Sequence, residues 1–245
     1  MPGIKAAGII LKQTEYGEGN RMLSIFTKEF GIISASAYGV KSMKSAKGAV
    51  CQFLNYAEFE LIKKNSDIYT VITASSIENF YPVSENIEKL SLAVYLCDVT
   101  YCGLGRENAD ERILSLLLNT LYIAAYTDVD LRKIKCIFEL KFMSLLGYHP
   151  MLSRCVKCAS SENILGFSPK NGGIVCKNCA KEALFIDRRT AAAITYILKS
   201  DGKAMYNVNL SGEVLTAAER ISEKYIQEQL DIDLQSLLYF KNMSI

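Results

Sequence analysis

Along the first 80 residues, hydrophobic and polar positions alternate as they do in half-buried β-strands. Ile33, Ala35 and Ala37, for example, are separated by Ser34 and Ser36. A period of two places one face of a strand in a core and the other in solvent. Strand-like runs with turn-like segments between them predict a small closed barrel of the OB type, although an SH3-like barrel has the same pattern. The five runs are residues 8–11, 23–27, 33–38, 57–61 and 68–73.

The pattern changes at Tyr81-Pro82-Val83, after which apolar residues recur at steps of three and four. This is the period of an α-helix with one buried face. Three helices are expected before the stop signal at Gly147, and their capping residues are Ser84, then Asn108 or Asp110, then Asp130. The face expected to be buried in the first helix carries Ile87, Leu90, Val94, Cys97, Tyr101 and Leu104. In the second helix it carries Ile113, Leu116, Leu117, Leu121 and Ala124, and in the third Leu131, Ile134, Phe138, Phe142 and Leu145.

Two further helices are expected near the C-terminus, one capped by Asp187 and one preceded by Ser211. The second helix is expected to be acidic on its outer face, through Glu213, Glu219, Glu223 and Glu228. We therefore predict an α+β multidomain chain, with an OB-fold β-barrel in residues 1–80 and an α-helical domain in residues 81–245. The helical domain carries an insertion at residues 150–182, which contains paired cysteines.

The insertion has the spacing of a zinc ribbon. Cys155 and Cys158 form one CxxC pair, and Cys176 and Cys179 form a second pair, with seventeen residues between the two pairs. Two such pairs around a hairpin, here with a turn at Asn171-Gly172, supply four thiolates to one tetrahedral zinc ion. Thioredoxin-like redox chemistry and disulfides are the competing interpretations. A thioredoxin-like site requires only one pair, and disulfides are not expected where no signal peptide is expected. Four protein ligands leave no open position, so the spacing indicates a structural zinc ion and argues against a zinc enzyme.

Composition narrows the class of protein. Half of the 245 residues are hydrophobic and the formal net charge is +2, so charge alone does not indicate a nucleic-acid partner. No apolar run is long enough to span a membrane, no signal peptide is expected at Met1, and a reducing cytoplasm is the expected compartment. The remaining cysteines are expected to be reduced, small apolar residues: Cys51, Cys97, Cys102 and Cys136.

Catalytic motifs are absent from the sequence. We find no P-loop, no GxGxxG and no GxSxG, and the single histidine, His149, lies in a turn-like Gly-Tyr-His-Pro segment. The balance of the sequence favours binding over catalysis, so we expect no enzymatic activity.

A basic segment follows the third strand-like run. Residues 39–48 contain Lys41, Lys44 and Lys47 and no acidic residue. A solvated, flexible loop has this composition, and so does a basic arm that follows a phosphate backbone. On the second interpretation the arm forms one patch with Arg21 and Lys28, and the neighbouring Tyr38 stacks on a base.

The order of barrel, helices, ribbon and helices resembles the RecO family of bacterial recombination mediators. The resemblance spans most of residues 1–190 and is most specific in the central run 138–150. It is carried by residues 8–12, 16–19, 23–31 and 38–42, and by residues 138–150, 155–158, 172–173 and 176–179.

The resemblance implies a non-enzymatic protein that binds single- and double-stranded DNA. It also implies annealing of strands that are coated by single-strand-binding protein, and action with RecR to help load RecA. Cytoplasmic, nucleoid-associated localisation follows from that role. The tail of single-strand-binding protein is acidic with an apolar end, so it requires a basic rim around an apolar pocket. Arg132, Lys133 and Lys135 are the residues that we predict for this rim.

Two other classes of protein have the same features. An OB-fold module with a zinc ribbon that acts on RNA would prefer RNA to DNA and would not anneal DNA strands. An enzyme that uses CxxC thiols for electron transfer would show free thiols before chelation as well as after it.

Overall fold

The protein was analysed as a computed structural model, which describes residues 3–40, 45–63, 67–105 and 108–243. The chain forms two compact units, Met1–Ser115 and Leu116–Ile245. No helix among the described residues is both long enough and apolar enough to cross a membrane.

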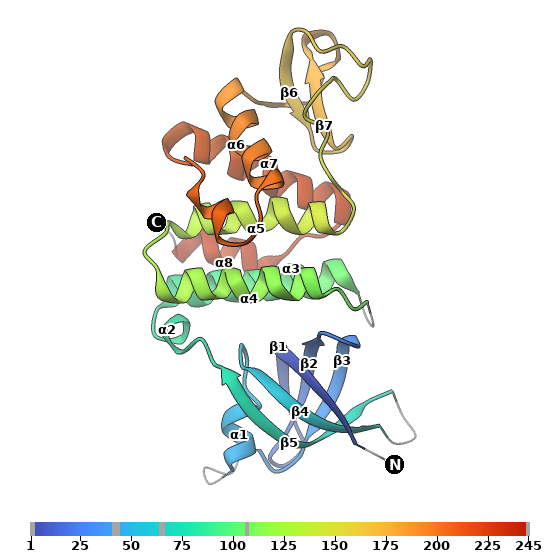
Figure 1. The fold of residues 1–245 in the computed structure, drawn as a ribbon, viewed down its shortest axis with the longest axis vertical. Coiled ribbons are helices and arrows are strands. Elements are labelled where there is room, and N and C mark those ends of the chain that lie inside the picture. The colour runs from blue at the N-terminus through green and yellow to red at the C-terminus, as the bar shows by residue number, and fades with distance from the viewer. Residues whose placement is uncertain (1–2, 41–44, 64–66, 106–107, 244–245) are drawn as a thin grey trace. The chain divides into compact units, whose positions relative to one another are not determined.

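The first unit contains a closed five-stranded barrel with the strand order β1-β2-β3-β5-β4 (Figure 1). β3 and β5 pair in parallel over a short ladder, and the other neighbouring strands pair antiparallel. This architecture confirms the predicted OB-like barrel. The elements are β1 (Ile4–Tyr16), β2 (Asn20–Thr27), β3 (Gly31–Ala37), α1 (Ala46–Val50), β4 (Tyr56–Lys63) and β5 (Tyr69–Glu78).

The barrel core consists of the alternating residues that the sequence pattern singled out. Ile33, Ala35 and Ala37 of β3 point into it, and their exposed fractions are 5%, 0% and 0%. Phe59 and Leu61 of β4 contribute to the same core. The polar positions between them lie on the other face of each strand, as the period of two requires.

Two helices follow the barrel within the first unit, α2 (Tyr81–Ser84) and α3 (Ile87–Leu104). α3 contacts β1, and the Lys12 ammonium explains part of this contact. Its Nζ lies 2.9 Å from Asp98 Oδ1 and 4.4 Å from the centre of the Tyr101 ring. The cap of α3 is Asn86, whose side chain accepts a hydrogen bond from the Lys89 N–H, and the predicted cap at Ser84 is therefore wrong.

The buried face of α3 also differs from the prediction. Ile87 and Val94, which were expected to be buried, are 61% and 36% exposed, whereas Leu92, Tyr95 and Leu96 are buried. Apolar residues occur on nearly all sides of this helix, so a period of 3.6 fits more than one face. Contacts made by the folded chain, and not the sequence period, select the face that is buried.

The second unit is mainly helical. Its helices begin largely as the capping signals predicted: Asp130 caps α5 and Asp187 caps α6 through their side chains, and Asp110 accepts a hydrogen bond from the Arg112 N–H at the start of α4. The buried face predicted for α4 is confirmed at every position. The helices are α4 (Glu111–Tyr126), which begins in the first unit, α5 (Leu131–Leu145), α6 (Arg188–Lys199), α7 (Gly212–Leu230) and α8 (Gln235–Met243), with 3-10 turns η1 (Lys177–Cys179) and η2 (Gly202–Asn207).

The packing of α5 against α7 overturns the expectation that α7 exposes all its glutamates. Glu219 and Glu223 are only 7% and 9% exposed, and they face Lys135 and Glu139 of α5, which are fully buried. The Lys135 Nζ lies 2.8 Å from Glu223, 3.3 Å from Glu139 and 3.5 Å from Glu219. Buried charges persist only when they are paired, and this contact fulfils that condition.

Two partly exposed cations complete the charge balance of this buried cluster. Arg132 pairs with Glu219, and Lys241 of α8 pairs with Glu223. Burial alone lowers the pKa of Lys135, but the three carboxylates outweigh it and raise that pKa above its ordinary value. Burial raises the pKa of Glu223, but the charges and hydrogen bonds of Lys135 and Lys241 together outweigh it, so the pKa of Glu223 is lowered.

Candidate metal centre and nucleic-acid surfaces

The predicted ribbon is a small antiparallel sheet with the strand order β7-β6-β8. It contains β6 (Ile164–Ser168), β7 (Gly173–Cys176) and β8 (Leu184–Phe185). The hairpin turn between β6 and β7 places Gly172 at φ +66°, a left-handed conformation that suits glycine, as the Asn171-Gly172 signal indicated. β8 was not predicted, because a strand of two residues leaves no periodic pattern.

Gly173 allows the chain before the ribbon to lie directly against β7. A Cβ atom at this position would lie 2.5 Å from the Met151 carbonyl oxygen and 2.5 Å from a methyl carbon of Val156. Met151 donates its N–H to Gly172 and accepts the N–H of Ile174, both at 2.9 Å. This contact fixes the segment that leads to the first cysteine pair.

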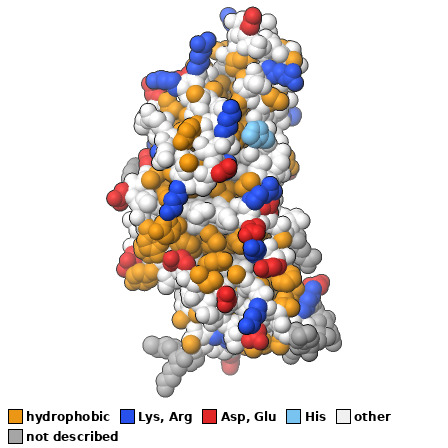
Figure 2. Space-filling model, in the orientation of Figure 1, with side chains coloured by type: hydrophobic (Ala, Val, Ile, Leu, Met, Phe, Trp, Pro, Cys, Tyr) orange, Lys and Arg blue, Asp and Glu red, His pale blue; other side chains and the backbone are white. Residues whose placement is uncertain are grey.

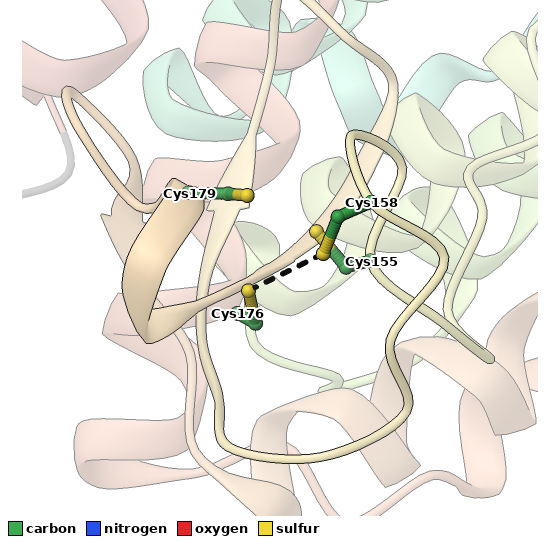
Figure 3. A group of neighbouring side chains, drawn as sticks. All are labelled: Cys155, Cys158, Cys176 and Cys179. Atoms are coloured by element: carbon green, nitrogen blue, oxygen red, sulfur yellow. Dashed lines mark hydrogen bonds between the residues drawn. The ribbon is translucent and has the colours of Figure 1, made fainter.

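The four predicted ligands come together at one end of this sheet. The Sγ atoms of Cys155, Cys158, Cys176 and Cys179 all lie within 4.8 Å of one another, and those of Cys158 and Cys176 are 3.6 Å apart. Figure 3 shows the four sulfur atoms facing a common space. A tetrahedral ion with sulfur bonds of about 2.3 Å places its ligand sulfurs about 3.8 Å apart, which this arrangement matches closely. The cluster can therefore hold one metal ion.

The protonation of the four thiols supports this fit. Backbone N–H groups, that of Cys176 foremost, hold the pKa of Cys155 at about 6, well below the ordinary thiol value. Sharing of hydrogen bonds with the sulfurs of Cys176 and Cys158 raises the pKa of Cys179 to about 12. Without a cation, the cluster thus favours a thiolate at Cys155 and a protonated thiol at Cys179. A bound cation deprotonates the remaining thiols.

The ribbon is attached to α7 by side chains that the sequence did not connect with it. The Tyr225 hydroxyl donates to the Tyr148 carbonyl at 3.0 Å, and its ring meets the edge of Phe167 with a centroid distance of 5.5 Å. Gln229 donates to the Pro169 carbonyl in the hairpin turn at 2.7 Å. No local pattern in the sequence indicates these partners of Tyr225.

The other cysteines and His149 lie outside the metal cluster. Burial raises the pKa of the Cys51 thiol to about 11 and that of Cys136 to about 12, and Cys97 is buried as well. Cys102 is exposed, which differs from the expectation of an apolar core residue. The His149 Nδ1 lies 2.8 Å from the Ser144 hydroxyl, at the turn that follows α5.

On the barrel, the structure divides the predicted basic patch. Arg21 pairs across the strands with Ala37, the residue before Tyr38, so Arg21 and Tyr38 share one end of the β2–β3 hairpin. Lys28 follows the last residue of β2 at the opposite end, about 23 Å away at the usual rise per residue, and its Nζ pairs with Glu111 at 2.7 Å. The prediction that Lys28 belongs to the same patch is therefore wrong.

At the end of the β2–β3 hairpin that carries Arg21, some side chains make structural contacts and Tyr38 is exposed to solvent. The Arg21 guanidinium donates to the carbonyls of Gly48 and Cys51, and Lys47 donates to the carbonyl of Val71 at 3.4 Å, so both side chains hold α1 against the barrel. Tyr38 is 51% exposed, and its ring meets that of Tyr16 with a centroid distance of 6.4 Å. Lys41 and Lys44 lie outside the described residues.

The three residues predicted as a docking rim do not all reach the surface. Arg132 is engaged by Glu219, and burial lowers the pKa of Lys133. Lys135 is fully buried among carboxylates, so the prediction that its ammonium lines a docking surface is wrong. The spacing of basic residues along a helix does not reveal which of them face the interior.

Comparison with known proteins assigns the family. The family described as "Recombination protein O N terminal" matches residues 1–80, and that described as "Recombination protein O C terminal" matches residues 84–238. A protein named "DNA repair protein RecO" from Acetivibrio thermocellus is 34% identical over 98% of this chain and 97% of its own length. Proteins of the same name from Caldicellulosiruptor saccharolyticus and Alkaliphilus metalliredigens are each 33% identical, over 98% and 93% of this chain and 99% and 94% of their own lengths. These matches cover nearly the whole chain, and the structure has an OB-like barrel, a helical unit and a four-cysteine cluster. The chain therefore belongs to the RecO family.

Proposed function

We propose that this chain acts in DNA repair by binding DNA without sequence preference and promoting the annealing of complementary strands. The observation that carries the proposal is the exposed Tyr38 at one end of an OB-like barrel, next to an acid-free basic segment. Exposed aromatic rings on such barrels stack on successive bases, and nearby cations follow the phosphate backbone.

Lysine side chains suit the physical logic of annealing. Two single strands repel each other through their phosphates, and bound cations reduce this repulsion. A lysine contacts a phosphate as a point charge and leaves the base edges free for pairing. Lys41 and Lys44 supply these charges in the proposal, whereas Arg21 and Lys47 shape the barrel end through their backbone contacts.

We infer that the metal held by the four cysteines is one structural zinc ion. Soft thiolate ligands in a tetrahedral arrangement select zinc or iron–sulfur centres, and two CxxC pairs around a hairpin are typical of zinc ribbons. With four protein ligands the ion supplies folding energy and offers no position for a substrate. The proposal therefore includes no catalytic residue.

The proposed partners follow from membership of the family. We propose cooperation with RecR and single-strand-binding protein in the loading of RecA, in the cytoplasm and close to the nucleoid. Arg132 and Lys133 remain our proposal for the tail of single-strand-binding protein. Lys133→Glu should weaken binding of an acidic tail peptide, and unchanged affinity would exclude this surface.

The DNA proposal is tested by the salt dependence of binding. In a Lys41→Ala/Lys44→Ala variant, the slope of log affinity against log salt for single-stranded DNA should fall by about 1.4, since each lost phosphate contact removes about 0.7. Tyr38→Ala should cost about 1–3 kcal/mol of binding free energy with little change in slope. The matched control is Lys199→Ala/Lys224→Ala, which removes two exposed lysines from α6 and α7.

Annealing of complementary strands coated by single-strand-binding protein is the second measurement. We expect the Lys41→Ala/Lys44→Ala variant to anneal more slowly than the wild type and the control variant. An unchanged slope and an unchanged annealing rate would refute the role of this segment. Preferential binding of RNA without annealing would instead indicate an RNA-binding module.

A further inference from the structure

A cleft of about 640 Å³ lies between the ribbon and the start of α6, within the second unit. This volume falls in the range of about 300–1,000 Å³ that is typical of small-ligand sites. Aliphatic side chains of Ile164, Ile174 and Ile186 line part of it. Ile174 and Ile186 are each only 4% exposed and form a packed apolar floor, whereas Ile164 is partly exposed.

The rest of the lining is polar and able both to donate and to accept hydrogen bonds. It includes the hydroxyls of Ser153 and Ser161 and the side-chain amide of Asn163. All three residues are exposed, which places them at the rim of the cleft. The edge of a nucleobase presents donors and acceptors together, so hydroxyl and amide groups can pair with it.

One basic residue lines the same cleft, and two others adjoin its lining residues along the backbone. Arg188 lines it, Arg154 follows the lining residue Ser153, and the Lys177 N–H donates to the carbonyl of the lining residue Asn163 at 2.9 Å. Within the described part of the chain, the side chains of Arg154, Lys177 and Arg188 form no ion pair or hydrogen bond. Over the region where Figure 1 draws β6 and β7, Figure 2 shows mainly white and orange surface, with Lys and Arg side chains beside it.

The acidic groups at the cleft are fewer and partly neutralised. Asp187 accepts the Thr190 N–H at 2.7 Å and pairs with the Arg189 guanidinium at 3.2 Å. Glu162 is the other carboxylate in the lining. Three free cations therefore exceed the one unpaired acid, and the cleft favours an anionic ligand.

The two carboxylates also discriminate between classes of anion. An acidic peptide would bring several adjacent carboxylates towards Glu162 and Asp187, and like charges at short range are unfavourable. A nucleotide brings a single negative charge for each base, together with a flat apolar ring for the apolar floor. The combination of apolar floor, amide and hydroxyl rim and separated cations thus matches a nucleotide better.

We propose that this cleft is a second DNA site, which holds one nucleotide of a single strand with its base against Ile164, Ile174 and Ile186. The phosphates on either side of that nucleotide contact Arg154, Lys177 and Arg188. The inference rests on the proposed DNA-binding function, but it concerns a site separate from the barrel residues.

The first test removes the three cations. Arg154→Ala/Lys177→Ala/Arg188→Ala should lower the salt slope for a labelled oligothymidine by about 2, because three contacts of about 0.7 each are lost. The matched control removes three exposed cations of α6 and α7 through Lys199→Ala/Arg220→Ala/Lys224→Ala. Lys199 ends α6, about 16 Å along the helix from Arg188. Metal content and helical circular dichroism establish that both variants are folded.

The second test fills the cleft and leaves its charge unchanged. Ala191 lines the cleft from α6, and Ala191→Phe should weaken binding several-fold while the salt slope stays constant. An oligonucleotide that carries photoreactive iodouracil should crosslink to cleft residues in the wild type and lose these crosslinks in Ala191→Phe.

Several outcomes would overturn the inference. Equal loss of slope in the control triple variant would show a general electrostatic effect, and crosslinks confined to the barrel would show that the cleft is not a DNA site. Displacement of a cleft-specific probe by an acidic peptide but not by oligothymidine would assign the cleft to a peptide. If DNA binding is lost in Lys41→Ala/Lys44→Ala and intact in the cleft variants, only this inference fails. Absence of DNA binding by the wild-type chain would refute the proposed function itself.

Discussion

The buried charge cluster between α5 and α7 gives a quantitative prediction. In Lys135→Met, the interior keeps the carboxylates of Glu139, Glu219 and Glu223, and only Arg132 and Lys241 remain to balance them. Removal of one partner of a buried ion pair typically costs about 3–5 kcal/mol. The variant can limit this cost by protonating one glutamate.

Protonation sets both the size of the effect and its pH dependence. From an ordinary Glu pKa of 4.5, protonation at about pH 7 costs about 3.4 kcal/mol, because each pH unit is worth about 1.36 kcal/mol. The folded variant then binds one proton more than its unfolded state, so its stability falls as pH rises. The free energy of unfolding should therefore be about 3–4 kcal/mol below that of the wild type at about pH 7, and the deficit should shrink by about 1.4 kcal/mol at about pH 6.

Urea unfolding followed by helical circular dichroism measures these differences. The double variant Lys135→Met/Glu139→Gln restores the charge balance and should recover most of the loss and remove its pH dependence. Lys224→Met, an exposed control on α7, should change stability by less than about 0.5 kcal/mol. A cost for Lys135→Met below about 1 kcal/mol that does not vary with pH would show that the cluster is solvated, and the reasoning would be refuted.

Three further results are expected from the metal site, its attachment and the acid range. Cys176→Ser should abolish stoichiometric zinc in elemental analysis and lower stability more than DNA affinity, since metal binding is part of folding; freshly purified wild-type protein without zinc would contradict this. Tyr225→Phe should cost about 1 kcal/mol through the lost bond to the Tyr148 carbonyl and leave metal content unchanged; loss of metal in this variant would contradict a purely mechanical attachment. Burial raises the pKa of Glu223, but the charges and hydrogen bonds of Lys135 and Lys241 together lower it below its ordinary value. The stability that this carboxylate contributes is therefore present above its ordinary pKa of 4.5 and is lost as pH falls below it. Unfolding free energy measured against pH should decline there, and less steeply for Glu223→Gln; identical curves would exclude this contribution.

Local signals in the sequence were sufficient for much of the architecture. The alternation around Ile33 and Phe59 identified barrel strands. Successive side chains of a strand point to opposite faces, so alternating apolar residues can all be buried on only one face. Asp130 and Asp187 identified helix starts, because a cap depends on hydrogen bonds within a single turn. The two CxxC pairs identified the metal cluster, because each spacer directs two sulfurs towards one point before any distant contact is made.

Long-range contacts decided the rest. A helix that is apolar on most sides, such as α3, has no unique inward face in its sequence. For this reason the prediction that Ile87 is buried is wrong. Charged residues were assigned outward by default, and Glu223 and Lys135 are buried because each finds the other across two helices that are 88 residues apart in sequence. Arg21 and Lys28 are close in sequence but lie at opposite ends of a strand, since a strand extends by about 3.3 Å per residue. Elements with local signals can therefore be predicted from the residues alone, whereas buried faces, charge pairs and surfaces depend on residues that are brought together only in the folded chain.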